Sequence, residues 1–110
     1  AVADTEAQVA LAAGDAAQAL TLAESARELA ARSGNQLAEL AAMLTQARAL
    51  RADGQPESAE RLFAESAARA RTSRVPGRLR EVLRDWADLR AGIGDHRGAY
   101  ELTSEALAVN

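Results

Sequence analysis

The chain of 110 residues has no cysteine, no lysine and only three aromatic residues, Phe63, Trp86 and Tyr100. Without cysteine, neither a disulfide bond nor a thiolate metal site can form. No apolar run approaches the roughly 20 residues needed to cross a bilayer. The first residues carry Asp4 and Glu6 and have no basic start, which is unlike a signal peptide. We therefore expect a cytoplasmic protein with no membrane partner.

Alanine and leucine dominate what is present, with 29 and 14 residues respectively. Alanine has the highest helix propensity, and β-branched residues are few, so the composition favours helix strongly over strand. At this length the chain has room for one domain with a modest core. The sequence predicts an all-α domain whose helices pack closely on small side chains.

Glycine and proline divide the chain into six segments of helical length. Short turns are expected at Gly14, Gly54 and Gly94, where glycine can adopt the left-handed conformation that ends a helix. Longer breaks are expected at 32–35 and 72–77. Apolar residues between the breaks recur at helical spacing. The predicted helices are 2–13, 16–32, 36–52, 57–71, 78–92 and 96–109.

Gly14, Gly54 and Gly94 stand 40 residues apart, and each begins a similar run of residues. A fixed period of this size is typical of stacked repeat units. Each unit also has small residues seven before, five after and twelve after its glycine. A small side chain at these places lets two helices cross closely. They are Ala7, Ala47, Ala87, Ala19, Ala59, Ala99, Ala26, Ser66 and Ala106.

This pattern of small residues around a glycine turn resembles the tetratricopeptide repeat. The resemblance implies three antiparallel helical hairpins, at about 1–33, 34–73 and 74–110, stacked in one domain as a short right-handed superhelix. The period is 40 residues instead of about 34. We expect the surplus to lie in longer helices and in the loops around 33–35 and 72–78.

In the tetratricopeptide family the first helix of each hairpin lines a concave groove that binds ligands. Members that clamp a peptide carboxylate use lysine and asparagine there, and this chain has neither at those places. The resemblance therefore implies a polar protein or peptide partner, or self-contact; a merely solvated face is the alternative. Carried over by position, the candidate binding residues are Leu44, Arg48, Arg51, Glu81, Arg84, Asp85 and Asp88.

Other candidates for chemistry are weak. Residues 66–84 hold six arginines against one acid, Glu81, but no aromatic is interleaved, so we expect ion pairs and not nucleic-acid contact. His96 beside Asp95 has no second ligand at helical spacing, and we expect it to be an exposed first-turn residue. Trp86 shares a stripe with leucines, which predicts burial in the core. We expect no metal, no cofactor and no enzymatic activity.

The segment 86–100, Trp-Ala-Asp-Leu-Arg-Ala-Gly-Ile-Gly-Asp-His-Arg-Gly-Ala-Tyr, resembles the C-terminal repeats of actinobacterial helix-turn-helix transcription regulators. That resemblance implies a regulatory or dimerisation region, cut from a larger protein whose DNA-binding part lies elsewhere. The alternative is a structural scaffold or chaperone-like adaptor unrelated to DNA. Because terminal repeats leave faces uncovered, we also expect self-association, or docking onto the rest of the larger protein, through the helices near 1–13 or 96–109.

Overall fold

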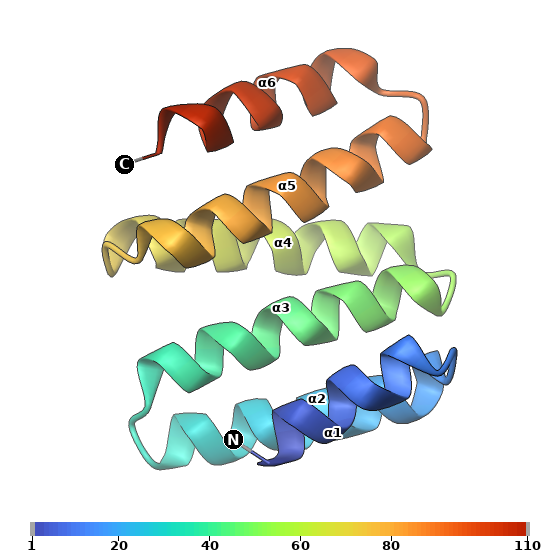
Figure 1. Ribbon diagram of the computed structural model, residues 1–110, viewed down its shortest axis with the longest axis vertical. Helices are drawn as coiled ribbons and strands as arrows, with labels where there is room; N and C mark the ends of the chain where they lie inside the picture. Colours follow the sequence, from blue (N-terminus) through green and yellow to red (C-terminus); the bar gives the residue numbers. More distant parts are fainter. Residues whose placement is uncertain (1, 110) are drawn as a thin grey trace.

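Six α-helices make up the protein, as the sequence predicts. A computed structural model describes residues 2–109, with side chains from Asp4 onward, and contains no strand within that range (Figure 1). From α3 on, every helix begins 20 residues after the one before it. The helices are α1 Val2–Ala12, α2 Ala16–Arg32, α3 Gln36–Ala52, α4 Pro56–Thr72, α5 Pro76–Gly92 and α6 His96–Ala108.

All five connections are three residues long and use the same turn. At the first, the N–H of Asp15 donates to the carbonyl of Ala10, and the N–H of Gly14 donates to that of Leu11. This pair of bonds is repeated at every connection and closes the helix through one residue with positive φ. The breaks predicted at 32–35 and 72–77 are therefore no longer than the other turns, and the second was placed too far into α5, which begins at Pro76. The loops around 33–35 and 72–78 hold none of the expected surplus. The residues with positive φ are Gly14, Gly34, Gly54, Arg74 and Gly94.

The starts of the helices explain why the second long break was misread. α2, α3 and α6 begin after Asp15, Asn35 and Asp95, whose side chains accept a hydrogen bond from the backbone of the first turn. α4 and α5 begin with Pro56 and Pro76 instead. Proline is favoured at that position because its missing N–H would have no helical partner there. Pro76 therefore begins α5 and does not extend the loop.

Arg74 is the one described residue other than glycine with positive φ, at 55°. A side chain in this conformation costs roughly 1–2 kcal/mol, which glycine avoids. We therefore expect Arg74→Gly to raise the free energy of unfolding by about 0.5–1 kcal/mol, part of the gain being offset by the freer unfolded chain. Gly34→Ala, at the equivalent turn, should lower it by a similar amount. Urea denaturation measures both changes in unfolding free energy. A lower unfolding free energy for Arg74→Gly than for the wild type would show that Arg74 is not strained.

Small residues lie where helices approach one another. Of the nine small positions in the pattern, all but Ala99 are buried, and Ala99 is half-buried. The larger buried side chains gather in the middle of the protein, between α3, α4 and α5. The five largest that are almost fully buried are Phe63, Met43, Leu44, Leu83 and Val82. The core therefore contains large side chains at its centre, whereas its buried side chains toward α1 and α2 are mainly alanine.

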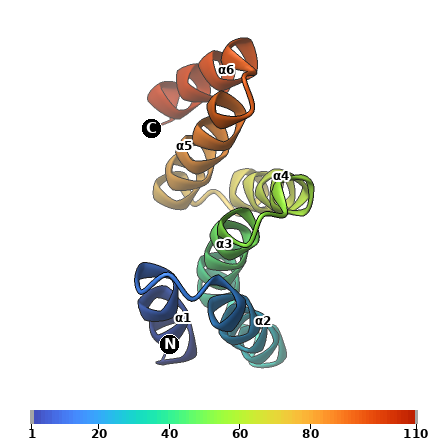
Figure 2. The ribbon, with the colours of Figure 1, turned by 90° about the vertical axis from the view of Figure 1, so that its right-hand side faces the viewer.

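Successive helices run back and forth and form a flat body of 35 × 30 × 18 Å (Figure 2). Their connections alternate between the two sides of Figure 1. Each helix contacts its neighbours in sequence, and α3 also contacts both α1 and α5. Between residues 2 and 109 the backbones of the even-numbered helices make no close contact with one another. The odd-numbered helices thus form one continuous face. No helix in this range combines the length and the apolar character that a membrane span requires.

Ala59 tests the close approach of helices at the small positions. It is fully buried in the central core, so we expect Ala59→Leu to overpack the site and cost roughly 1–3 kcal/mol of unfolding free energy. Ala99→Leu is the matched variant at the equivalent position of α6, which is only half-buried, and it should cost less. Equal unfolding midpoints for the two variants and the wild type would show that these positions are not tight crossings.

Candidate functional site

The predicted binding residues lie on the face formed by the odd-numbered helices, and several of them bind one another. Arg48 of α3 donates a hydrogen bond from Nε to Asp85 of α5, and its Nη2 lies 3.8 Å from Glu81 Oε2. Arg51, one turn further along α3, donates to the backbone carbonyl of Asp88 at 3.3 Å. Two arginines of one helix therefore span to the next odd-numbered helix.

Beside these contacts the surface is hollowed into a recess of about 380 Å³. Its polar rim is formed by Arg48, Arg51 and Asp85, three of the seven predicted residues. Leu11 of α1 supplies apolar surface, and the fully buried ring of Phe63 lies behind it. The recess thus joins side chains from four helices, three of them odd-numbered. An apolar pocket with a few charged groups at its edge can hold one apolar side chain of a partner and fix its orientation.

The other predicted residues divide between core and solvent. Leu44 is 1% exposed and packs in the central cluster, so its side chain offers no surface to a ligand. Glu81, Arg84 and Asp88 are exposed on α5. The charged residues of the predicted set are three arginines and three acids, so this face is close to neutral. Such a face has no strong preference for a ligand of one charge.

Two of the six arginines in residues 66–84 bind acidic side chains of other helices. Arg69 contacts Glu39 of α3 at 2.7 Å. Arg71 forms two hydrogen bonds of 2.8 Å with Glu105, which joins α4 to α6. The forked guanidinium suits this two-point contact with a carboxylate. Arg69 thus connects α4 to α3, and Arg71 connects it to α6, whose backbone stays apart from α4. Arg74 and Arg84 are exposed, and the absence of nucleic-acid contact stays a prediction.

Asp95 and His96 serve the start of α6. The backbone N–H of Gly98 donates to the Asp95 carboxylate at 2.9 Å, and Arg90 donates to it at 2.9 Å. The Gly98 bond is the main cause that holds the pKa of Asp95 below its usual value, and Arg90 adds to it against a smaller effect of burial. His96 is exposed at the first helical position, as predicted. No cluster of three side chains able to hold a metal ion occurs in the described part of the chain.

Trp86 is half-buried and not enclosed in the core as predicted. Its ring packs against the central cluster, and its Nε1–H donates to Glu60 of α4 at 3.1 Å. Arg90, one turn later, also pairs with Glu60. A buried indole N–H needs a partner, and Glu60 provides one at the edge of the core. Trp86 therefore joins two helices and does not form an open ligand platform.

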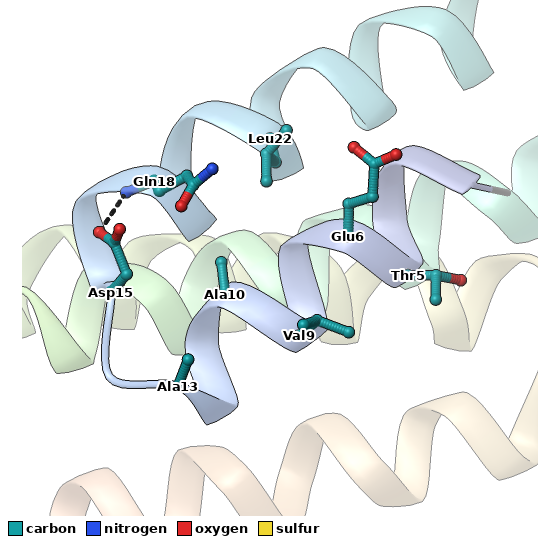
Figure 3. A pocket seen from close by; sticks show the side chains of 8 residues that line it. All are labelled: Thr5, Glu6, Val9, Ala10, Ala13, Asp15, Gln18 and Leu22. Carbon is teal, nitrogen blue, oxygen red and sulfur yellow. Dashed lines mark hydrogen bonds between the residues drawn. The ribbon is translucent and has the colours of Figure 1, made fainter.

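A second hollow, larger than the recess, was not predicted from the sequence. It measures about 570 Å³ and lies on α1 and α2 (Figure 3). Its surface is mainly apolar and includes Val9, Ala10 and Leu22, with Glu6 and Asp15 among the polar groups. In the sequence Val9 has the pattern of a buried residue, because Ala49 and Leu89 occupy the same place in the next two units. Only the folded structure shows that nothing in the described chain covers it.

No family model, curated protein or solved structure matches the chain.

The contact of Arg48 with Asp85 can be measured by a double-mutant cycle on unfolding free energy, with Arg48→Ala, Asp85→Ala and both changes together. Their side chains are 37% and 24% exposed, and we expect a coupling of about 0.5–1 kcal/mol that falls as salt is added. The same cycle on Arg97 and Glu101, which are 92% and 67% exposed within α6, is the control and should give a smaller coupling. No coupling between Arg48 and Asp85 would mean that both are free for a ligand.

Proposed function

We propose that this protein is a protein-interaction module and not an enzyme, and that it binds a peptide or a protein segment across the face of its odd-numbered helices. The observation that carries the proposal is the recess at Arg48, Arg51 and Asp85, because it combines apolar surface with charged groups held by neighbouring helices. The polar rim would fix the orientation of the ligand, and Leu11 would contact one of its apolar side chains.

The repeat arrangement supports this reading. We infer three antiparallel hairpins stacked as a short right-handed superhelix of the tetratricopeptide type. The 40-residue period, the buried small residues and the contacts of α3 with both α1 and α5 favour it. In such arrays the first helices of the hairpins form the concave surface. They would here be α1, α3 and α5, which supply most of the recess.

The charge balance of the face indicates the chemistry of the partner. Arg48 already engages Asp85 and Glu81, so a ligand carboxylate would have to compete with two acids of the protein. A strongly acidic or strongly basic ligand gains little from a neutral face. A segment that alternates apolar and polar residues, and carries both signs of charge, fits it better.

The resemblance of residues 86–100 to the repeats of actinobacterial transcription regulators favours a role as the regulatory or dimerisation region of such a regulator. In that role the module would sense a peptide or protein signal in the cytoplasm. The alternative is a scaffold or chaperone-like adaptor without a link to DNA. A helix-turn-helix domain elsewhere in the same gene product would favour the regulator, and further repeats alone would favour the scaffold.

Selection of a random peptide library against the 110-residue chain tests the module. We expect binders of micromolar affinity that shift the NMR signals of Leu11, Ala52 and Asp85, which line the recess. Arg51→Glu should weaken their binding about tenfold, the effect of losing one well-placed contact. Arg61→Glu, a change at an exposed arginine of α4, is the matched control and should leave the affinity unchanged. Binders that map to another face, or tolerate Arg51→Glu, would refute the proposed site.

A further inference from the structure

The two end surfaces of the helix array are complementary halves of one repeated interface. The period of 40 residues relates positions in successive units, so the contacts inside the array show what each uncovered position would meet. Val9 is 65% exposed, whereas its equivalents Ala49 and Leu89 are 0% and 3% exposed. Ala49 and Leu89 each have a preceding unit beside them and Val9 has none. The hollow on α1 and α2 is therefore the receiving half of the interface, left open.

The presenting half is open on α6. Leu107 is 76% exposed, whereas its equivalent Ala67 in α4 is fully buried. Tyr100, which is 73% exposed, is equivalent to Glu60 of α4. Glu60 lies against the following unit, where it pairs with Trp86 and Arg90. Two of the largest exposed apolar side chains of the protein thus occupy places that meet the next unit inside the array.

The two open halves can form the same kind of hydrogen bond as the internal interface, with donor and acceptor on opposite sides. Inside the array the aromatic Trp86 of the receiving unit donates its N–H to the carboxylate of Glu60 on the presenting helix. At the ends, the receiving place of Trp86 holds Glu6 and the presenting place of Glu60 holds Tyr100. The phenol can donate to the carboxylate, so an aromatic donor and an acidic acceptor would meet again. Ala10, at the place of Arg90, leaves room for the ring beside Glu6 in the hollow.

We propose that the chain associates head to tail with further copies of itself, with α6 of one copy seated in the hollow on α1 and α2 of the next. Tyr100 would contact Glu6 and Ala10, and Leu107 would be covered as Ala67 is. The interface joins two different surfaces, so each copy keeps one free end of each kind and the assembly grows with concentration. The proposal does not depend on the recess of the odd-numbered helices.

Two blocked variants test the proposal by sedimentation velocity. Val9→Arg spoils the receiving half, and Leu107→Glu spoils the presenting half by placing a charged side chain where the next copy would cover an apolar one. Both residues are exposed, so the fold should be kept, and circular dichroism checks it. The wild type should exceed dimer mass as concentration rises, and each variant alone should stay monomeric. Mixed one to one, the two variants should form a heterodimer and stop there, because only one intact pair of halves remains.

Other outcomes would overturn the proposal. A wild type that is monomeric up to about 1 mM, where even weak association registers, refutes it. A single variant that still dimerises by itself indicates a symmetric contact instead, and a mixture that stays monomeric shows that the halves do not meet. Leu37→Glu, a change at a 63% exposed leucine of α3, is the control and should leave association unchanged.

Tyr100→Phe tests the register of the contact. Loss of the hydroxyl bond to Glu6 should weaken association about tenfold, as for a hydrogen bond to a charged group. Glu6→Gln should weaken it less, since an amide oxygen still accepts the bond. Full association by Tyr100→Phe would place the tyrosine elsewhere. Because these positions lie away from the recess, the end variants should keep peptide binding, and Arg51→Glu should keep association, so failure of one proposal leaves the other standing.

Discussion

The close approach of helices at small side chains is the constraint on which the rest of this structure depends. Alanine at a helix crossing lets the backbones come together but buries little apolar area of its own. Larger residues fill the centre, where Phe63, Met43 and Leu83 lie. At α1 and α2 the buried cluster is made of alanine, with partly buried leucines against it. The array therefore gains its stability from contacts between units more than from within any one of them.

Arginine side chains link helices whose backbones are not in close contact. The even-numbered helices make no close contact with one another in the described range, yet Arg27 reaches Glu65 and Arg71 reaches Glu105 across the gap. On the opposite face Arg48 pairs with Asp85 between α3 and α5, which also contact each other. Such pairs are partly exposed and each contributes modestly. Their effect is to link neighbouring units through side chains.

Local signals made the helices predictable. Each turn is closed by hydrogen bonds within six residues of one another, and from α2 to α6 each helix start has either a capping side chain or a proline. The expected helices 16–32 and 36–52 match the structure, and the others differ by at most two residues at an end. The error at 72–77 has a physical cause. Proline and glycine indicate a loop as readily as a helix start. At this turn Arg74 occupies the position with positive φ that glycine has in the other turns, so the turn is not recognisable from the sequence.

The candidate site was predictable only in part, because the exposure of a side chain depends on distant parts of the chain and not on its sequence neighbours alone. The sequence by itself determined six helices, the places of the five turns between them and a set of small buried positions, since these follow from short-range hydrogen bonding and side-chain size. Only the tertiary structure decided that Leu44 is core, that Arg48 engages Asp85, and that Val9 is open where Ala49 and Leu89 are closed. Equivalent positions in a repeat have the same pattern in sequence, and their burial depends on whether a neighbouring unit lies against them.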